Sequence, residues 1–445
     1  MRNHTSVFIT GLALFAMFFG AGNLILPVMI GIDGGTAATT VTGGFVLTGV
    51  LLPILAMVAA ATSTRGIEGL AKRIGHYPGL IYCWIAFLST GVLYAIPRVT
   101  TVSFGMSAGA IADLDSTPGS PGLFVYTVVF LVFAALFAAN PSGIIAKVGS
   151  WLTPVLLILM LALIVGAVVT LTPVLDAPVD DYSAVPFVSG LLTGYNTLDA
   201  IASLVFGGIV IDSLRARGYR KGLPLFRATV FSGIIAGVLL ALIYFGLSAV
   251  GLRIGDAVVT DGAAGLAYAA RLIYGAPGQW ILGLIAILAC LTTAVGLFGA
   301  STNFFHTQFP QISHTRLLII QVIVAGVVAN LGLATLMNVV VPLMYFCYPA
   351  TIAIIAVALV DIAVPGHLHW SYRLSAWVAA LFGLVDALAQ GFVLFGATPP
   401  TWFTVLIEAI PLADLSLGWL VPTLGAFIIG LTWDGITGRL SRHAA

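Results

Sequence analysis

Apolar runs long enough to cross a lipid bilayer follow one another along the whole chain of 445 residues. A helix needs about 20 apolar residues to span a hydrocarbon core of ~30 Å. Only 7% of the residues are charged and 60% are hydrophobic, whereas a water-soluble domain carries roughly 25% charged residues. Because a helix satisfies its own backbone groups in lipid, we expect an all-α integral membrane protein with a single membrane domain over residues 1–445.

The apolar runs predict twelve transmembrane helices. An even number of crossings places both termini on the same side of the membrane. The predicted spans are Ser6–Ile30, Ala37–Ala61, Leu80–Ile111, Leu123–Ala139, Leu152–Leu171, Val185–Ile211, Phe226–Val250, Trp280–Phe305, Leu317–Leu333, Val339–Val360, Leu374–Phe395 and Leu415–Leu431.

The charges between the spans predict the orientation of the chain. Loops on one expected side hold Arg65, Lys72, Arg73 and the basic cluster from Arg215 to Arg227, while loops on the other side hold mainly Asp and Glu. Basic loops stay in the cytoplasm, so we expect both termini to be cytoplasmic. The formal net charge of +1 offers no basic surface for nucleic acid.

Motifs for chemistry are absent from the sequence. No histidine lies deep within a predicted span, and the sequence lacks Gly-x-Ser-x-Gly, His-Glu-x-x-His and Walker patterns. Cys83, Cys290 and Cys347 lie in apolar runs without a CxxC pair, which indicates small core residues. We therefore expect neither an enzyme nor an ATP-driven pump, and no cofactor besides a coupling ion.

Two predicted spans, the first and the sixth, are interrupted near their middle. Unpaired backbone groups are tolerated at membrane depth only where they line a cavity or bind a ligand, although a lone Gly-x-Gly more often marks close helix packing. The first break contains Gly20, Ala21, Gly22 and Asn23, and the second contains Thr193, Gly194, Tyr195, Asn196 and Thr197.

The position of the two breaks predicts an inverted repeat. Each break lies in the first helix of a five-helix half, and halves with an odd number of helices run in opposite senses through the bilayer. Interrupted helices at corresponding positions indicate a transporter's binding site at the midplane. We expect the two halves at residues 6–172 and 185–360, followed by two further helices at 374–431.

The atoms at the breaks favour an amino acid as the substrate. The half-helix that starts near Gly22 and Asn23 offers free N–H groups and a positive dipole end to a carboxylate. Carbonyl groups at the ends of the other half-helices suit an ammonium group or a hard cation such as sodium. A zwitterion carries both kinds of group at this separation.

Further motifs extend from the two breaks to the end of the chain. They are Phe15 to Asn23 with Pro27, Pro97 to Phe104, Thr193 to Asp199 with Val205-Phe206-Gly207, Arg215 to Gly218, Leu291 to Leu297, and Trp433-Asp434. In these motifs the chain resembles the bacterial branched-chain amino acid:cation symporters, which have the LeuT-type fold of the APC superfamily. The resemblance implies sodium-coupled import of leucine, isoleucine and valine by alternating access, in the bacterial cytoplasmic (inner) membrane.

The resemblance also implies a sodium site between the first and eighth helices. Its ligands would be the carbonyls of Ala16, Phe19 and Ala289 and the hydroxyls of Thr292 and Thr293. The two threonines follow Ala289 by three and four residues, so their oxygens can converge one helical turn on. On spacing alone, threonines that bond back to their own helix are the more common case.

Three ionisable residues fall within predicted spans, where an unpaired charge is costly. Arg98 and Asp199 could neutralise each other, and a purely structural pair is equally compatible with the sequence. Asp386 lies outside the ten-helix repeat, so we expect a structural or interfacial role. Tyr94, one turn before Arg98, and Phe206 are candidates for the wall of the substrate site, with ordinary aromatic packing as the alternative.

Two other functions remain compatible with the sequence. The same fold could couple to protons or carry another small neutral amino acid or solute, or the protein could be a channel or sensor that binds an amino acid without translocating it. The expected partners are the amino acid, a sodium ion and the lipid bilayer, with no obligate protein partner.

Overall fold

In the computed structural model, residues 2–440 are described apart from 64, 141–143, 180, 256–258, 260, 332 and 395. Phe395, the predicted end of the eleventh span, and the side chain of Ala21 therefore lie outside the description. The described residues form helices and no β-strand, which confirms the all-α prediction. Eight of these helices are long and apolar enough to cross a membrane, or nine if one bent pair counts as a single span.

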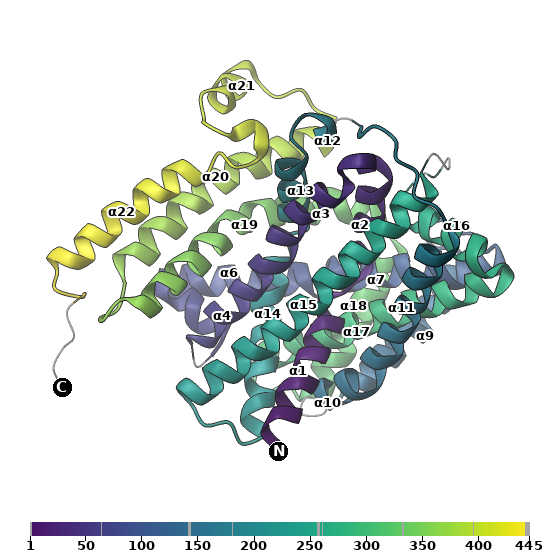
Figure 1. Ribbon diagram of the computed structural model, residues 1–445. Coiled ribbons are helices and arrows are strands. Elements are labelled where there is room, and N and C mark those ends of the chain that lie inside the picture. The colour runs from purple at the N-terminus through teal and green to yellow at the C-terminus, as the bar shows by residue number, and fades with distance from the viewer. Residues whose placement is uncertain are drawn as a thin grey trace.

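The first half of the chain begins with a broken helix and ends at a loop that precedes a second broken helix (Figure 1). Its elements are α1 (Arg2–Phe18), α2 (Ala21–Gly34), η1 (Gly35–Ala37), α3 (Ala38–Val46), η2 (Leu47–Leu51), α4 (Leu52–Ala61), α5 (Ile67–Ala71), η3 (Lys72–Ile74), α6 (His76–Thr90), α7 (Ala95–Phe104), η4 (Gly105–Gly109), α8 (Ala110–Ala112), α9 (Pro121–Ala138), α10 (Ile144–Lys147), η6 (Val148–Leu152) and α11 (Thr153–Thr170).

The second half contains the longest helices of the molecule. Its elements are α12 (Asp181–Ala184), α13 (Pro186–Tyr195), α14 (Asp199–Ala216), α15 (Leu223–Ile254), α16 (Gly262–Tyr274), α17 (Ala276–Gln308), α18 (His314–Asn330), α19 (Leu333–Ala363), α20 (Trp370–Leu394), α21 (Thr401–Glu408), η7 (Ala413–Leu415) and α22 (Leu420–Ile436).

The predicted spans fall largely on helices. The third predicted span is interrupted between α6 and α7, the last span begins at Leu420 and not at Leu415, and the short helices α5, α12, α16 and α21 lie in predicted loops. Asp261 begins α16 by accepting the backbone N–H of Ala264 at 2.9 Å, which is the usual role of an aspartate at a helix N-cap. The three cysteines are free and buried.

Helices α3 and α13 pack backbone to backbone through glycines. A Cβ on Gly44 would lie 2.0 Å from the carbonyl oxygen of Phe187, and a Cβ on Gly190 would lie 1.9 Å from that of Val41. Any larger residue at either position would force the helices apart. This contact between small residues fixes the first half of one broken helix against its neighbour.

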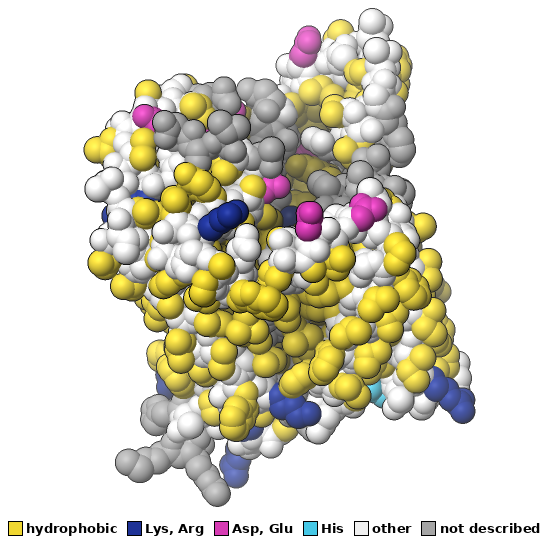
Figure 2. Space-filling model, turned by 90° about the vertical axis from the view of Figure 1, so that its right-hand side faces the viewer, with side chains coloured by type: hydrophobic (Ala, Val, Ile, Leu, Met, Phe, Trp, Pro, Cys, Tyr) yellow, Lys and Arg dark blue, Asp and Glu magenta, His cyan; other side chains and the backbone are white. Residues whose placement is uncertain are grey.

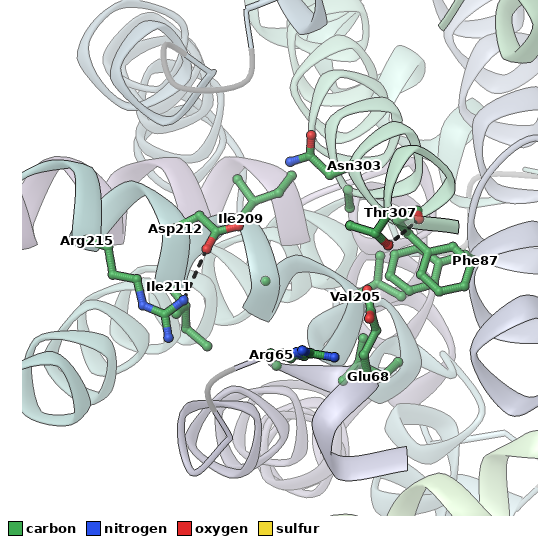
Figure 3. Close-up of a pocket in the computed structure, with 15 residues that line it drawn as sticks. Arg65, Glu68, Phe87, Val205, Ile209, Ile211, Asp212, Arg215, Asn303 and Thr307 are labelled. Carbon is green, nitrogen blue, oxygen red and sulfur yellow. Dashed lines mark hydrogen bonds and ion pairs between the residues drawn. The ribbon is translucent and has the colours of Figure 1, made fainter. Parts of the chain in front are cut away.

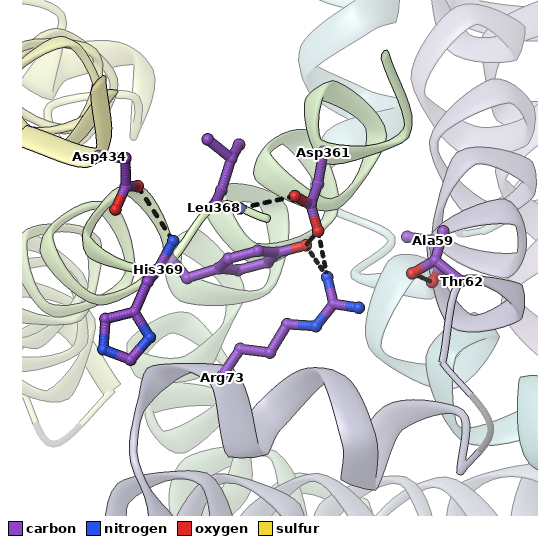
Figure 4. A network of polar contacts seen from close by, with 8 residues as sticks. Ala59, Thr62, Arg73, Asp361, Leu368, His369 and Asp434 are labelled. Atoms are coloured by element: carbon purple, nitrogen blue, oxygen red, sulfur yellow. Dashed lines mark hydrogen bonds and ion pairs between the residues drawn. The ribbon is translucent and has the colours of Figure 1, made fainter. Parts of the chain in front are cut away.

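A polar network joins the C-terminal helices to the loop before α6 (Figure 4). Arg73 forms an ion pair of 2.7 Å with Asp361 and also contacts the hydroxyl of Tyr372. Asp434 accepts the backbone N–H groups of His369, Trp370 and Ser371, each at 3.0 Å. An aspartate at this position satisfies the amides at the start of α20, so the Trp433-Asp434 motif links α22 to α20.

The surface has a hydrophobic band between two ends that carry charged side chains, as a bilayer requires. Figure 2 shows a broad hydrophobic band around one face of the molecule, with Asp and Glu side chains toward the upper end and several Lys and Arg side chains at the lower end. Basic side chains are also visible near the upper end of this face. Helices α19, α20 and α22 lie side by side at the edge of the bundle (Figure 1). The two broken helices lie in its interior, because residues 11–20 and most of α14 are buried.

Candidate functional site

The first broken helix is interrupted at Phe19 and Gly20. Helix α1 ends at Phe18, and Gly20 is extended, with φ −98° and ψ −167°, before α2 begins. A Cβ on Gly20 would lie 3.2 Å from the hydroxyl oxygen of Thr293, so the break is in close contact with α17. The amides in the first turn of α2 have no acceptor within their own helix and remain available to a ligand.

The second broken helix turns by 49° between α13 and α14. Its break contains Asn196, Thr197 and Leu198, and Leu198 has a left-handed backbone with φ +59°. The hydroxyl of Thr197 donates to the carbonyl of Gly194 at 2.8 Å. A left-handed conformation is uncommon for a branched residue and marks a locally constrained site.

Asn23 connects the two breaks. Its side-chain amide donates to the carbonyl oxygen of Phe18 at 2.6 Å and to a carboxylate oxygen of Asp199 at 3.2 Å. The first contact satisfies a carbonyl at the end of α1, and the second holds the first residue of α14. Asn23 is therefore both a cavity residue and the hydrogen-bonded link between the broken helices.

A central cavity of about 330 Å³ lies at these breaks, at the lower end of the range for small-molecule sites. Polar groups come from the two breaks, while one wall is apolar and contains Phe206, whose ring centroid lies 5.7 Å from that of Phe18. The predicted residues that line the cavity are Gly20, Gly22, Asn23, Tyr94, Arg98, Asn196, Thr197, Asp199, Phe206 and Thr293.

Three predicted binding residues on α13 do not line the central cavity. Thr193 faces a different cavity, and the site of a Cβ on Gly194 is 2.3 Å from the hydroxyl of Thr48 on η2. The hydroxyl of Tyr195 accepts a hydrogen bond of 2.9 Å from the indole of Trp419. These three residues are close to the break in the sequence, but the direction of α13 points them away from the central cavity.

Five oxygen atoms of α1 and α17 converge beside the first break. The hydroxyl of Thr292 lies 2.8 Å from the carbonyl oxygen of Ala16 and 2.9 Å from that of Ala289. The hydroxyl of Thr293 lies 3.1 Å from the carbonyl oxygens of both Met17 and Ala289, and 3.4 Å from that of Ala16. Each threonine therefore bonds to its own helix and also to α1.

This oxygen cluster has the chemistry of a site for a hard monovalent cation. It contains four of the five predicted sodium ligands, and the carbonyl of Met17 takes part where that of Phe19 was expected. All five oxygens are uncharged, and hard cations prefer oxygen ligands. Among the described residues, His, Cys, Asp and Glu form no group of three or more that could hold a metal ion.

The predicted direct ion pair between Arg98 and Asp199 is not formed. Both side chains line the central cavity, but within the described part of the chain they form no ion pair within 4.0 Å. Asp199 instead accepts the amide of Asn23, and Arg98 donates to the hydroxyl of Tyr94 at 3.1 Å. The amide of Asn23 contacts one carboxylate oxygen of Asp199, and Arg98 acts on this carboxylate only at longer range.

The interruption between α6 and α7 was not predicted. It places Tyr94 and Arg98 in the wall of the central cavity. The backbone N–H of Leu93 donates to the carbonyl of Leu88, and that of Ile96 donates to the carbonyl of Gly91. Each bond spans five residues where an α-helix spans four, so the chain forms a wider turn around Tyr94. Pro97 cannot donate a backbone hydrogen bond, and a Cβ on Gly91 would lie 2.4 Å from the carbonyl of Phe87. The spacing of Gly91 and Pro97 was the available signal for this third break.

Two further cavities lie at opposite ends of the α13–α14 pair. We call the one lined by Asp33, Asp181, Thr193 and Asn196 the Asp33 vestibule; it measures about 430 Å³ and shares Asn196 with the central cavity.

The opposite cavity, which we call the Arg65 vestibule, measures about 510 Å³. Its wall includes Arg65, Glu68, Asp212 and Arg215, and Asn303 lies across it from Arg65 (Figure 3). Along α14 and α17 its lining residues follow those of the central cavity. The central cavity thus has a polar vestibule at each end.

Asp386 lies closer to the site than its position on α20 suggested. Its carboxylate interacts electrostatically with Tyr195 and Tyr345. Tyr345 lines the central cavity, and its hydroxyl donates to the side-chain oxygen of Asn196 at 3.4 Å. A helix outside the predicted repeat therefore places an ionisable side chain near the second break.

Comparisons with known proteins bear on this geometry. Residues 3–437 match the family described as "Branched-chain amino acid transport protein". The chain belongs to this family. Members of the family are transport proteins, in agreement with the expectation that the chain is not an enzyme, and the apolar helices make this chain a multi-pass membrane protein.

Relatives in this family match over almost their full length. The branched-chain amino acid permease BrnQ of Corynebacterium glutamicum is 39% identical over 429 residues, covering 96% of this chain and 95% of the relative. BrnQ of Bacillus subtilis is 34% identical over 427 residues, covering 95% and 96% of the two chains. BrnQ of Escherichia coli K12 is 33% identical over 434 residues, covering 96% and 95%.

A solved structure supports the fold of the family. Mhp1, a nucleobase-cation-symport-1 family transporter in a closed conformation, is similar with a TM-score of 0.59 and 16% identity, covering 98% of this chain and 94% of the other. At this identity the likeness concerns the fold alone. It agrees with the predicted class of transporter fold with broken helices.

Proposed function

We propose that this protein is a sodium-coupled symporter that imports leucine, isoleucine and valine by alternating access. The observation that carries the proposal is the central cavity at the two helix breaks, which has an oxygen cluster directly beside it. Thr293 belongs to both: it lines the cavity and contacts the carbonyls of Ala16, Met17 and Ala289. The relatives' names support a branched-chain amino acid as the substrate.

The cavity wall suits a branched aliphatic amino acid. The free amides at the start of α2 and the positive end of that helix attract a carboxylate. Phe206, Leu26, Val341 and Met344 supply apolar surface for the side chain. Asp199, which is close to the second break, supplies negative charge for the ammonium group.

Sodium is the coupling ion in this proposal. The uncharged oxygens of α1 and α17 can hold it only while the two helices keep their present spacing, so the ion stabilises the arrangement that forms the cavity. By linkage, sodium raises the affinity for the substrate and the substrate raises the affinity for sodium equally.

The transport cycle follows from the three cavities. The Asp33 vestibule and the Arg65 vestibule would open in turn to the central cavity while the other end stays closed. We further propose twelve crossings, with inverted repeats at residues 6–172 and 185–360 and two further helices at 374–431. Broken helices at corresponding positions of two halves are typical of inverted-repeat transporters.

The proposed location is the bacterial cytoplasmic membrane, with both termini in the cytoplasm. The Arg65 vestibule then faces the cytoplasm. The distribution of acidic and basic side chains at the two ends of the hydrophobic band supports this orientation (Figure 2).

Labelled leucine uptake into proteoliposomes tests the proposal. An inward sodium gradient should drive accumulation, and isoleucine and valine should compete while polar amino acids should not. Uptake that persists without sodium and follows a proton gradient would replace sodium by protons. Leucine binding without uptake would identify a sensor, and the absence of both would contradict the substrate assignment.

A further inference from the structure

Arg98 is a cation placed next to the positive end of a helix. Its Nη2 atom lies 3.1 Å from the position that a Cβ on Gly22 would occupy, and Gly22 is in the first turn of α2. The N-terminus of a helix carries roughly half a positive charge. The guanidinium and the helix end therefore repel each other unless a negatively charged group lies between them.

Among the described residues no carboxylate forms an ion pair with Arg98; Asp199 lines the same cavity and interacts with Arg98 only at longer range. Arg98 is held by Tyr94, whose hydroxyl it contacts at 3.1 Å and whose ring centroid lies 5.6 Å from the guanidinium carbon. Both contacts orient the guanidinium, and neither carries a full negative charge. Within the described residues Asp199 forms no ion pair with Arg98; it accepts the amide of Asn23 and lies at the start of α14, where that helix end stabilises a carboxylate.

We propose that Arg98 binds the carboxylate of the substrate, together with the free amides at the start of α2. This inference rests on the proposed function, in which an amino acid occupies the central cavity. A guanidinium can donate two parallel hydrogen bonds to a carboxylate, and the two positive groups become complementary to one anion. Asp199 is then free to face the ammonium group instead of Arg98.

The arrangement makes the carboxylate the feature by which substrates are selected. A site built to bind a polar group rejects an analogue that lacks it, because its own groups are then left unpaired. Leucinol keeps the side chain and the amine of leucine but has an alcohol in place of the carboxylate. Arg98 should therefore exclude leucinol, and Gly22 should be required because a side chain there would displace the guanidinium.

Equilibrium binding of labelled leucine to the purified full-length protein, with leucinol as competitor, tests this role. In Arg98→Gln leucine binding should weaken at least about 30-fold, and the preference for leucine over leucinol should fall toward one. Arg98→Lys should keep part of the preference, and Gly22→Ala should weaken binding less than Arg98→Gln. Arg271→Gln, an exposed position on α16, is the matched control and should bind as the wild type does.

A double variant separates this role from a structural one. If Arg98 only balances Asp199, then Arg98→Gln/Asp199→Asn should recover leucine binding, and such recovery would overturn the inference. An unchanged preference for leucine over leucinol in Arg98→Gln would overturn it as well. Thermal stabilisation by sodium should persist in Arg98→Gln and shows that the variant is folded.

The failure of this inference is distinguishable from the failure of the proposed function. Wild-type protein that binds leucine, with an Arg98→Gln variant that binds it equally well, contradicts the role of Arg98 alone. Wild-type protein that binds no leucine contradicts the proposed function.

Discussion

Replacing the hydroxyl of Thr292 or Thr293 by a methyl group should weaken sodium binding while keeping the shape of the side chain. The Thr292 hydroxyl spans the carbonyls of Ala16 and Ala289 at 2.8 and 2.9 Å, so Thr292→Val removes one of the five converging oxygens. A polar contact to a charged group contributes about 1.5–3 kcal/mol, which corresponds to a roughly 10- to 150-fold higher sodium concentration for half-maximal uptake.

The two variants should differ in their effect on leucine. Thr293 lines the central cavity, whereas Thr292 is not among its lining residues. Thr292→Val should therefore change the sodium dependence and leave the KM for leucine at saturating sodium nearly unchanged. Thr293→Val should change both.

Leucine uptake into proteoliposomes, with sodium varied at constant ionic strength, measures both quantities. Thr302→Val is the matched control: Thr302 is buried on the same helix, and its hydroxyl accepts a hydrogen bond from Gln321 at 3.2 Å. Equal sodium dependence in Thr292→Val, Thr293→Val and the wild type would refute the cation site. An equal loss in Thr302→Val would show that the effect is general destabilisation of α17.

Three further predictions concern stability, measured as thermal unfolding in detergent. Gly190→Ala should destabilise the protein by about 3 kcal/mol through overpacking, whereas Gly43→Ala, with nothing within 4 Å of its Cβ, should be neutral or slightly stabilising; similar values would contradict the packing of α3 on α13. Arg73→Gln should cost about 2 kcal/mol because it leaves Asp361, 7% exposed, without its cation, and an unchanged unfolding temperature would show that the pair is not stabilising. Burial raises the pKa of Glu68 above its usual 4.5 despite nearby basic residues. The stability that protonated Glu68 contributes is therefore complete below pH 4.5 and is lost as the pH rises through the raised pKa of the folded state. Glu68→Gln should make the unfolding temperature less dependent on pH in this range, and an unaltered pH profile would contradict the prediction.

The helix breaks and most of the oxygen cluster of α1 and α17 could be predicted from the sequence for a physical reason. Unpaired backbone groups are tolerated inside a membrane only where they line a cavity or bind a ligand, and glycines within an apolar run mark the positions where the helix can unwind. Residues three and four apart, such as Ala289, Thr292 and Thr293, lie on the same face of a helix whatever the rest of the fold is. The contact of Met17 instead of Phe19 depends on where α1 unwinds, which spacing does not define.

Side-chain directions next to the breaks could not be predicted. Once α13 and α14 meet at 49°, helical periodicity no longer relates residues across the break, so Gly194 and Tyr195 face other helices. Arg98 and Asp199 were opposite charges in one region, and only the structure places the amide of Asn23 at the carboxylate. The widened turn before Tyr94 had a signal in Gly91 and Pro97, but each residue alone is common in membrane helices.

The interlocked glycines of α3 and α13 have a mechanical consequence. Gly44 and Gly190 bring the two backbones so close that there is no room for a Cβ at either contact, so sliding or rotation of one helix would press the side chains of neighbouring residues against backbone carbonyls. The two helices therefore behave as one stiff lever, and the short segment with the left-handed Leu198 is its joint. We expect the conformational cycle to change the angle at this joint, while the outer surface of the lever keeps its contact with the surrounding lipid.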